Sequence, residues 1–380
     1  PTTPLRRSRR QRQMCIRDRG KLVEKCGGTF RRHEMVVDDT AKIKQALKTA
    51  VKDDYQVIMV LGGSSAGSED FAKTAIVDIG EIKVHGVTIM PGKPVVIGSV
   101  ENKPVFGIPG YPVSAIIAFE QFVQPLLYML LGQPQPQRET IAVQPTKKIA
   151  SKLGVEEFLR VKLGEVGGRI VATPLPRGAG TITSITEADG IIRIPNHVEG
   201  INETERVSAE LLRPLPNIRR TIVIVGSHDK SLDVLADQLK AGHSELTLSS
   251  SHVGSMGGLM AIKRGVCHLA GTHLLDTEDG SYNRSYLKKY LPDTAVKLIH
   301  LVHRDQGLIV KPGNPKEIHG IEDIGRKDVS FINRQVGSGT RILLDYKLNQ
   351  LGITADVING YQNEEFTHMA VAVSVLSGSE

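Results

Sequence analysis

The sequence predicts an α/β protein interrupted by an all-β segment, and three observations support this. Residues 21–136 alternate apolar, strand-like runs with segments of helical periodicity. Residues 137–217 hold short apolar runs between Gly and Pro turns, and from residue 218 the alternation of strands and helices returns. A chain of 380 residues has room for two or three domains, since single domains typically hold about 100–200 residues. We therefore predict domains at 21–136, 137–217 and 218–380.

The first segment begins with a predicted helix over Thr40–Val51, because Ile43, Leu47 and Val51 recur at helical spacing. A strand buried on both faces is predicted at Val57–Leu61, and a helix followed by such a strand favours a parallel sheet. Further strands are predicted at Val87–Met90, Val95–Ile97 and Val105–Ile108. A long helix over Pro112–Leu131, kinked at Pro125, follows them, and a proline-rich linker at 132–137 ends the segment.

The two later segments are read by the same rules. In the all-β segment we predict strands at Ile141–Val143, Phe158–Leu163, Ile170–Pro174, Gly190–Ile194 and Arg206–Leu211. In the last segment we predict strands at Thr221–Gly226 and Glu245–Ser249 and helices at Ser231–Lys240, Val253–Arg264 and Phe366–Leu376.

The positive charge of the chain lies almost entirely in its first residues. Residues 1–20 contain seven arginines and one aspartate, a net +6 out of the +7 of the whole chain. This tail lacks helical or strand periodicity, so we expect it to be disordered and foreign to the fold. The rest of the chain is almost neutral, which argues against a nucleic-acid-binding function.

Cysteine and hydropathy patterns argue against other classes of protein. Cys15, Cys26 and Cys267 form no CxxC pair, and the 12 histidines form no HExxH pattern, so neither a disulfide framework nor a zinc site is predicted. Polar residues and Pro125 interrupt the apolar run Ile116–Leu131, so no membrane-spanning segment is predicted. We expect a soluble, cytoplasmic protein.

Three glycine-rich stretches in the first segment predict binding of an anionic ligand. They are Gly62–Asp70, Met90–Pro94 and Gly107–Ala115. The first and third join a strand to a helix, where backbone N–H groups can face a phosphate or a similar oxyanion. In the second, Pro91 and Pro94 stiffen the turn that presents Lys93. Asp70 is a candidate ligand of a divalent cation.

Each stretch alone could be an ordinary turn of an α/β protein. Together they resemble the signature loops of the molybdopterin molybdenumtransferase family. In that family a GGxSxGxxD loop, a PGKP turn and a G-[LI]-PG-x-P-VSA loop line the pocket for adenylylated molybdopterin. The resemblance implies insertion of molybdate into this substrate with release of AMP, aided by Mg²⁺, in a protein that is a homodimer at full length. It assigns catalytic roles to Asp70 and Lys93, metal binding to Asp70, and binding of the molybdopterin substrate to Gly62, Gly63, Ser64, Ser65, Gly67, Pro91, Gly92, Pro109, Gly110, Pro112 and Ser114.

Two positions depart from the family pattern. Tyr111 stands where the family often has Asn, and Met90 stands where some members carry a second lysine. The all-β segment resembles the small C-terminal β-barrel of the same family, including the stretch 178–190. Thr183 and Ser184 lie near where the family places a pocket hydroxyl and are candidate ligand-binding residues, whereas the other hydroxyls of this segment fit solvated turns.

The last segment carries a second candidate site. Ser249–Gly258 and Asn333–Arg341 each place hydroxyls and glycine N–H groups at a helix start after a strand, an arrangement that favours an oxyanion. Helix capping alone also explains Ser and Thr at such positions. The candidate oxyanion-binding residues are Ser250, Ser251, Ser255, Ser338, Gly339, Thr340 and Arg341, with His273 and His368 as weaker additions.

Four segments of this part of the chain together resemble the periplasmic-binding-protein-like domain that is fused to some of these transferases, namely Ala270–Leu275, Arg304–Gly307, Pro312–Pro315 and Gly337–Arg341. In that architecture two α/β lobes close over a small ligand. The predicted architecture is therefore a molybdopterin-binding-type α/β domain, a small β-barrel domain and a partial two-lobed periplasmic-binding-protein-like α/β domain. Molybdate, tungstate and a pterin all remain candidate ligands of the last domain.

The sequence is also compatible with two other functions. One is a molybdopterin adenylyltransferase, which the PGKP turn and the β segment argue against, and the other is an oxyanion- or pterin-sensing protein that acts through the last domain. The resemblance also implies a preceding portion with an acidic Gly-[DN]-Glu motif, and nothing before Lys21 matches it. We expect a fragment, incomplete at its C-terminus as well, that binds its ligand weakly or needs partner residues.

Overall fold

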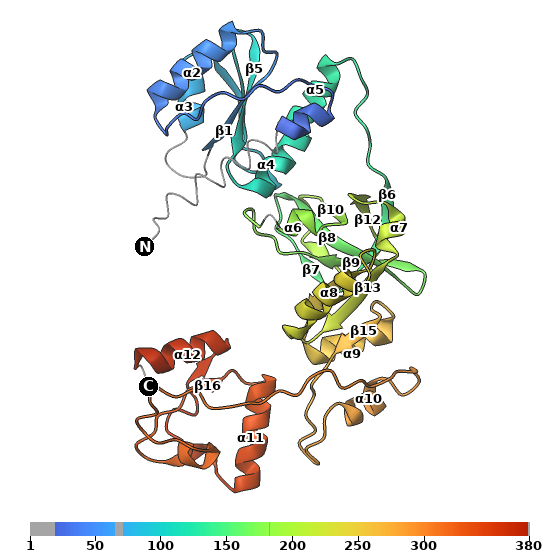
Figure 1. Ribbon diagram of the computed structural model, residues 1–380, viewed down its shortest axis with the longest axis vertical. Coiled ribbons are helices and arrows are strands. Elements are labelled where there is room, and N and C mark those ends of the chain that lie inside the picture. Colours follow the sequence, from blue (N-terminus) through green and yellow to red (C-terminus); the bar gives the residue numbers. More distant parts are fainter. Residues whose placement is uncertain (1–19, 65–70, 182, 379–380) are drawn as a thin grey trace. The chain divides into compact units, whose positions relative to one another are not determined.

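The computed structural model describes residues 20–64, 71–181 and 183–378 (Figure 1). It divides the chain into two units. The first unit runs to Val223 and includes His243–Ser249, and the second comprises Ile224–Gly242 and the residues from Ser250 onward.

The first domain is built on a four-stranded sheet. Its strands are β1 (Ile58–Ser64), β2 (Glu81–His85), β4 (Val96–Val100) and β5 (Lys103–Pro109), in the order β1-β5-β4-β2. β1 pairs parallel with β5, but β4 pairs antiparallel with both β5 and β2. The predicted parallel sheet is therefore wrong. Glu101 and Asn102 join β4 to β5 with positive φ angles, and such a two-residue turn makes a hairpin, whose strands are antiparallel.

Helices cover both faces of this sheet. α2 (Thr40–Lys52) and α3 (Phe71–Val77) lie on one face, where Leu47 and Val105 belong to the same buried cluster. The neighbouring Phe106 points to the opposite face and joins a second cluster there, as the two-residue period of a strand requires. α2 begins where the Asp39 carboxylate accepts a hydrogen bond of 3.0 Å from the backbone N–H of Lys42.

A long helical segment lies on that second face. It consists of α4 (Pro112–Ala118), the π-helical turn η1 (Phe119–Val123) and α5 (Gln124–Leu130). The interruption predicted at Pro125 occurs at η1. Pro125 follows this π-helical turn and cannot donate a backbone hydrogen bond. By length and composition, Pro112–Leu130 is apolar enough to cross a membrane, contrary to the reading of its sequence. Core helices pass the same test, and Ala115, Phe119 and Val123 are buried in the second cluster.

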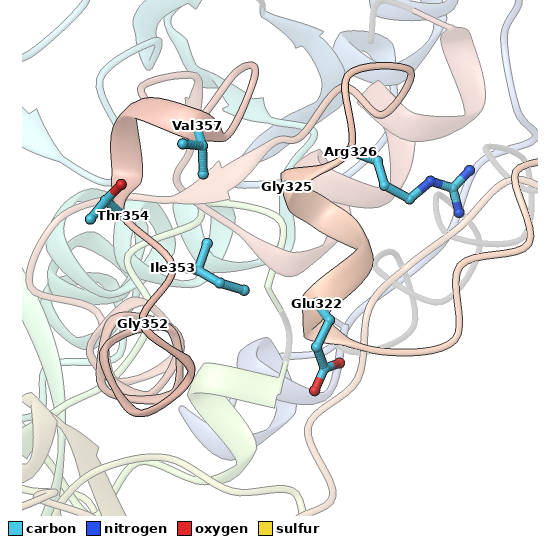
Figure 2. Close-up of a pocket in the computed structure, with 7 residues that line it drawn as sticks. All are labelled: Glu322, Gly325, Arg326, Gly352, Ile353, Thr354 and Val357. Atoms are coloured by element: carbon cyan, nitrogen blue, oxygen red, sulfur yellow. The ribbon is translucent and has the colours of Figure 1, made fainter.

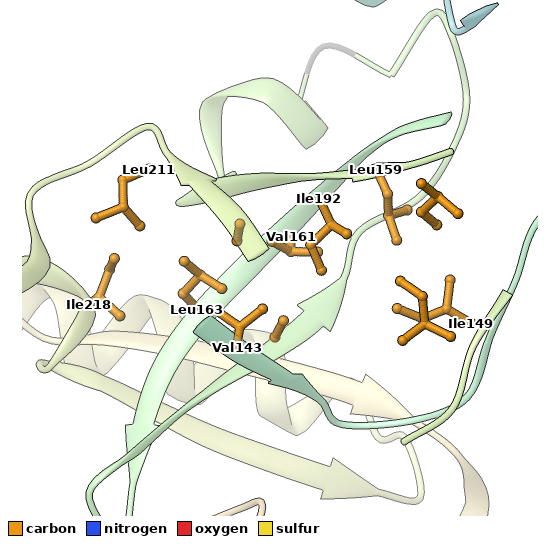
Figure 3. Close-up of a cluster of buried hydrophobic side chains, with 12 residues drawn as sticks. Val143, Ile149, Leu159, Val161, Leu163, Ile192, Leu211 and Ile218 are labelled. Carbon is orange, nitrogen blue, oxygen red and sulfur yellow. The ribbon is translucent and has the colours of Figure 1, made fainter. Parts of the chain in front are cut away.

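The second domain is a closed barrel, as predicted. Its strands are β6 (Thr140–Pro145), β8 (Glu156–Val166), β9 (Arg169–Pro174), β10 (Gly190–Ile194) and β12 (Val207–Leu211). They follow the order β10-β12-β6-β9-β8, and the pairing of β8 with β10 closes the ring. Its shorter elements are β7 (Ile149–Ala150), β11 (Gly200–Ile201), α6 (Thr183–Thr186) and α7 (Leu215–Ile218). Figure 3 shows its core, where Val143, Leu163 and Ile192 converge from three strands.

The sheet domain and the barrel are joined within the first unit by β3 (Ile89–Met90). This short strand pairs parallel with the start of β8 in the barrel. Ile89 and Ile117 are buried together with Phe158 and Ile191 of the barrel. The turn that contains Lys93 is therefore held between the two domains.

Replacing Leu163 with alanine should lower the free energy of unfolding of the first unit by about 2–5 kcal/mol, because the side chain lies in the barrel core with 0% exposure. Leu153→Ala in the same domain is the matched control, since Leu153 is 56% exposed, and we expect a change of at most about 0.5 kcal/mol. Urea unfolding of both variants checks this. Equal shifts in the two variants would contradict the assigned core.

The chain beyond the barrel begins with a three-stranded sheet in the order β14-β13-β15. Its elements are β13 (Thr221–Gly226), α8 (Ser231–Gly242), β14 (Thr247–His252), α9 (Gly254–Arg264) and β15 (Leu269–Gly271). β15 is parallel to β13. The backbone N–H groups of Thr247 and Val253 donate to the carbonyls of Arg220 and Gly226, so β14 advances in the same direction as β13. The carboxyl ends of these strands share one edge.

The remaining elements of the second unit are α10 (Arg284–Tyr290), η2 (Ile321–Gly325), β16 (Asn333–Arg334), α11 (Gly339–Leu351), η3 (Ala355–Val357), β17 (Glu364–Glu365) and α12 (His368–Ser377). Ile324 of η2, Leu348 of α11 and Ile358 after η3 form a small core. β16 and β17 form a parallel pair. This places the start of α11 directly after a strand, as the sequence predicts.

Candidate functional site

The first and third glycine-rich stretches meet at the carboxyl ends of β1 and β5. Leu61 lies opposite Ile108 and Ser64 lies opposite Pro109 in this parallel pair. Gly62 has a φ of +89°, and a Cβ atom built on Gly110 would lie 3.5 Å from the Gly62 Cα atom. Carboxyl ends of parallel strands are where open α/β sheets bind ligands, so this edge is the first candidate site.

The Met90–Pro94 turn lies against the third stretch. Gly92 has a φ of +122°, and a Cβ atom there would lie 2.9 Å from Ile89 Cδ1 and 3.6 Å from the Ser114 carbonyl oxygen. The Lys93 carbonyl accepts hydrogen bonds from the N–H groups of Val87 and Val95, at 2.9 and 3.0 Å. The backbone of Lys93 is thus fixed while its side chain is exposed. All three stretches converge on one edge.

Part of the predicted site lies outside the described residues. This part comprises Ser65, Gly67 and Asp70, and the side chain of Ser64. The predicted Mg²⁺ ligand, Asp70, is thus not placed. Within residues 20–64, 71–181 and 183–378, no three His, Cys, Asp or Glu side chains gather in a group that could hold a metal ion.

A loop of the barrel covers the start of α4. The backbone N–H of Val113 donates to the Ala179 carbonyl at 3.1 Å, and a Cβ atom on Gly180 would lie 3.5 Å from Tyr111 Cδ1. One N–H group at this helix start is therefore engaged by the protein itself. Tyr111, the residue that departs from the family pattern, is 66% exposed beside the same loop.

Arg160 of β8 holds both ends of that loop. Its Nη2 donates to the Pro176 carbonyl at 2.9 Å, and its Nε donates to the Ser184 hydroxyl at 3.0 Å. Ser184 in turn donates to the Thr181 carbonyl at 2.7 Å, and its side chain is 1% exposed. The candidate hydroxyl of Ser184 is thus fully used in holding the loop, whereas Thr183 is exposed.

The charge of Arg160 is buried, and burial lowers the pKa of its guanidinium while Glu157 counteracts the shift. Glu157 is itself buried and accepts hydrogen bonds from Arg177 Nε at 2.5 Å and from the Ser151 hydroxyl at 2.8 Å. One carboxylate therefore compensates the charges of Arg160, beneath the loop, and of Arg177, within it.

In the second unit, His273 connects the two predicted oxyanion stretches. The Ser255 hydroxyl oxygen lies 3.1 Å from both the backbone nitrogen and Nδ1 of His273. On the other side, a Cβ atom on Gly339 would lie 2.9 Å from His273 Nε2. Ser338 caps α11 by accepting a bond of 3.3 Å from the backbone N–H of Arg341.

The other predicted residues of this second site have different surroundings. Arg341 is 4% exposed, lies 3.1 Å from Asp345 and 3.7 Å from Glu364, and stacks 3.9 Å from the centre of the Tyr361 ring. Its charge is compensated inside the lobe, so its side chain is structural. Ser251 is buried with no hydrogen-bond partner for its hydroxyl among the described residues, and Ser250 and Thr340 are half-buried.

As pH falls, protonation of His273 should destabilise the second unit at a higher pH than protonation of its carboxylates does. Burial, and next the charge of Arg304, lower the pKa of His273 from its usual 6.5, while Asp229 opposes the shift. The unfolded chain therefore binds the proton more readily, so this stabilisation is complete above pH 6.5 and is lost as pH falls through the folded pKa. Hydrogen bonds from Ser231 lower the pKa of Asp229 from 3.8, so its contribution is lost only below that pH.

We expect the urea midpoint of the second unit to fall between about pH 7 and about pH 5, and His273→Gln to flatten this dependence. His300→Gln is the matched control, because His300 is exposed in the same unit. The pKa of His368 in the same unit is lowered as well, so part of the slope should remain. A slope as steep in His273→Gln as in the unaltered chain would contradict the assignment.

Three family descriptions match successive parts of the chain. Residues 20–128 match a probable molybdopterin binding domain, residues 142–212 match the MoeA C-terminal region (domain IV), and residues 236–380 match a PBP superfamily domain. The chain therefore contains MoeA-type domains followed by a PBP-like domain. We call residues 20–212 the MoeA-type half and residues 236–380 the PBP-like half. The resemblance read from the three loops, the barrel and the last segment is thereby confirmed.

Known relatives match the chain in part. A putative molybdopterin biosynthesis protein of Methanocaldococcus jannaschii is 34% identical over 193 residues, which cover 50% of this chain and 45% of the relative. The molybdopterin molybdenumtransferase of Haemophilus influenzae is 35% identical over 123 residues, 31% of this chain and 30% of the relative. A solved molybdopterin biosynthesis MoeA protein from Pyrococcus horikosii shares 34% identity, with a TM-score of 0.44 over 52% of this chain and 47% of that chain. This chain spans about half or less of these relatives' length.

Sequence reasoning missed Arg160 and the contact of Ala179 with the MoeA-type sheet domain. A charged residue in the middle of the apolar run Phe158–Leu163 was the available signal for Arg160, since a charge inside a core strand requires compensation. No local signal marked Ala179, because its carbonyl acts on a residue 66 positions away.

A surface pocket of about 350 Å³ lies in the PBP-like half, away from every predicted site residue. Glu322, Gly325, Arg326, Gly352, Ile353, Thr354 and Val357 line it. Figure 2 shows Ile353 and Val357 facing its interior, while the Arg326 side chain points away. Arg326 pairs with Asp328 at 2.8 Å, so the pocket offers no convergent set of polar groups and we assign it no function.

Proposed function

We propose that the MoeA-type half takes part in molybdenum cofactor biosynthesis by binding adenylylated molybdopterin and inserting molybdate, with release of AMP. The observation that carries the proposal is the convergence of three loops on one edge of the sheet, with Gly110 against Gly62 and Gly92 against Ser114. The family matches and the relatives named as molybdenumtransferases support it. The chain spans only part of those relatives, so the reaction itself is a proposal.

The arrangement addresses the main physical difficulty of this reaction. The pterin phosphate and molybdate are both anions and must be held close together. Backbone N–H groups at the first and third loops and the exposed ammonium of Lys93 would offset their repulsion. The backbone of Lys93 needs little reorganisation, because its carbonyl accepts two hydrogen bonds. Asp70 would bind Mg²⁺ to supply further positive charge; it lies outside the described residues, and we assign no step to the metal.

The test is an assay of AMP release by the full chain from adenylylated molybdopterin, with and without molybdate. We expect release that depends on molybdate and gives molybdenum-loaded cofactor. A parallel reaction with ATP and molybdopterin separates the alternative adenylyltransferase activity. AMP transfer from ATP, or AMP release that ignores molybdate, would refute the proposal.

We also propose that the protein acts in the cytoplasm and that the complete protein is a homodimer. Both follow from the proposed reaction and the family rather than from the described structure. Light scattering would show a monomer if the homodimer proposal is wrong. Fractionation of cells would find the protein in another compartment if the cytoplasmic location is wrong.

A further inference from the structure

Tyr111 is a large aromatic side chain that is left uncovered at the edge where the three loops meet. It follows Gly110, the residue on which a Cβ atom would lie 3.5 Å from the Gly62 Cα atom. Tyr111 is 66% exposed, whereas the residues that come soon after it in α4, Val113–Ala115, are buried. An aromatic ring is therefore presented to the surroundings at the first candidate site, where the loop that carries it turns into the core.

The backbone that carries Tyr111 is held in place by the helix that follows it. Pro112 occupies the first turn of α4, where its ring restricts φ to about −65°. The Tyr111 carbonyl accepts a hydrogen bond of 2.9 Å from the backbone N–H of Ala115. Tyr111 is the N-cap residue of α4, but its side chain makes no capping hydrogen bond. The helix thus fixes the backbone of Tyr111 and makes no use of its side chain.

The barrel approaches Tyr111 with residues that have little or no side chain, Gly178–Gly180. Their loop is attached to the start of α4, because the Ala179 carbonyl accepts the hydrogen bond from Val113 described above. A Cβ atom built on Gly180 would lie 3.5 Å from Cδ1 and 3.9 Å from Cε1 of Tyr111. These two carbons are neighbours on one edge of the ring. The loop therefore supports this edge, and most of the side chain stays accessible.

Such a ring is suited to stacking on another planar ring. A tyrosine offers a large contact area and has only two side-chain torsions to order, so little conformational entropy is lost when it binds. Stacking between an aromatic side chain and a heteroaromatic base is favourable and tolerates different bases, because every base has a π face. The fixed backbone of Tyr111 lowers the cost of ordering further.

We propose that Tyr111 stacks on a planar heteroaromatic ring of the ligand and gives this site a preference for ligands that carry such a ring. The inference rests on the proposed function and deepens it, since adenylylated molybdopterin contains two rings of this kind, the adenine and the pterin. Lys93 and the backbone N–H groups attract the anionic part of the ligand, and Tyr111 contacts its ring. An asparagine, the residue often found here in the family, has no aromatic face and cannot make this contact.

Titration calorimetry of the full chain with AMP, ribose 5-phosphate and molybdopterin isolates the ring contact. AMP and ribose 5-phosphate differ by the adenine, so the ratio of their dissociation constants measures what the adenine contributes. We expect Tyr111→Ala and Tyr111→Asn to raise the dissociation constant of AMP or of molybdopterin about tenfold, the usual effect of losing one stacking contact. The probe that is affected identifies the ring. Tyr111→Phe should bind all probes as the unaltered chain does, because it keeps the ring.

Met129→Ala is the matched control. Met129 lies in α5 of the same helical segment and is 69% exposed, so the substitution removes a side chain of similar exposure away from the converged loops. We expect it to change none of the three dissociation constants. Urea unfolding of Tyr111→Ala should match that of the unaltered chain, because the Tyr111 side chain is exposed and does not cap α4. A loss of binding is then not a loss of folding.

The outcomes separate this inference from the proposed function. Unchanged affinity of Tyr111→Ala for both AMP and molybdopterin would overturn the inference, as would an equal loss for ribose 5-phosphate or an equal loss in Tyr111→Phe. Absence of AMP and molybdopterin binding by the unaltered chain would overturn it as well. Ring binding that depends on Tyr111, found together with AMP release that ignores molybdate, would refute the proposed reaction and support the inference.

Discussion

Lys93→Ala should lower kcat/KM for molybdate-dependent AMP release by about 10²-fold or more, the usual cost of removing one electrostatic stabiliser from a reacting centre. Lys93 is the cation of a turn whose backbone is fixed on both sides by hydrogen bonds to Val87 and Val95. The turn fixes where the positive charge of Lys93 lies, and this position matters as well as the charge itself. Lys93→Arg should therefore retain only part of the activity, since the guanidinium is larger and differently shaped.

The matched control for Lys93 is Lys83→Ala. Lys83 lies on β2 of the same sheet and pairs with Glu81 on the surface, so its loss removes an equal charge away from the converged loops. We expect its effect on AMP release to be less than about twofold. Equal rates in Lys93→Ala and Lys83→Ala would show that the Met90–Pro94 turn does not contribute to the reacting centre.

The largest effect on stability should come from Glu157→Ala, which we expect to lower the free energy of unfolding of the first unit by about 3–5 kcal/mol. Glu157 is 2% exposed and is the carboxylate that compensates Arg177 and the buried Arg160. Its removal leaves a buried cation without a partner, which costs more than the pair itself contributes. Urea unfolding of the full chain measures the change.

Glu165→Ala is the control for this second prediction. Glu165 also lies on β8 and pairs with Arg219 at 2.9 Å, but this pair is on the surface. We therefore expect Glu165→Ala to lower the free energy of unfolding by at most about 1 kcal/mol. Because Arg160 holds the loop at Pro176 and Ser184, Glu157→Ala should also increase hydrogen exchange in that loop. Similar losses for the two glutamates would contradict the role assigned to Glu157.

Elements with a strong period were predictable from the sequence. The spacing of Ile43, Leu47 and Val51 placed α2 with the observed start, and the closely spaced strands of the second segment predicted its all-β structure. The resemblance, and not the spacing, predicted that these strands close into the barrel whose core Figure 3 shows. The direction of pairing in the first sheet was not predictable in this way. It depends on the two-residue turn at Glu101 and Asn102, and neither residue is the glycine that usually marks such a turn.

The candidate sites show the same division between local and distant causes. Glycine and proline patterns located the three loops, because each pattern reflects a local backbone requirement. Their meeting at one edge depends on the register of β1 with β5 and on the packing of Gly92 against Ser114, which no local pattern contains. In the second unit, the sequence pointed to Arg341, but the partners that compensate it, Asp345 and Glu364, were identifiable only in three dimensions.

We propose that the three loops form one pocket for adenylylated molybdopterin. Hydrogen exchange measured by mass spectrometry on the full chain, with and without this ligand, tests whether they do. We predict that the ligand slows exchange together at residues 62–64, at the Met90–Pro94 turn and at residues 107–115, and that Lys93→Ala reduces the protection at all three. Protection confined to a single loop, or found only beyond residue 224, would contradict the claim.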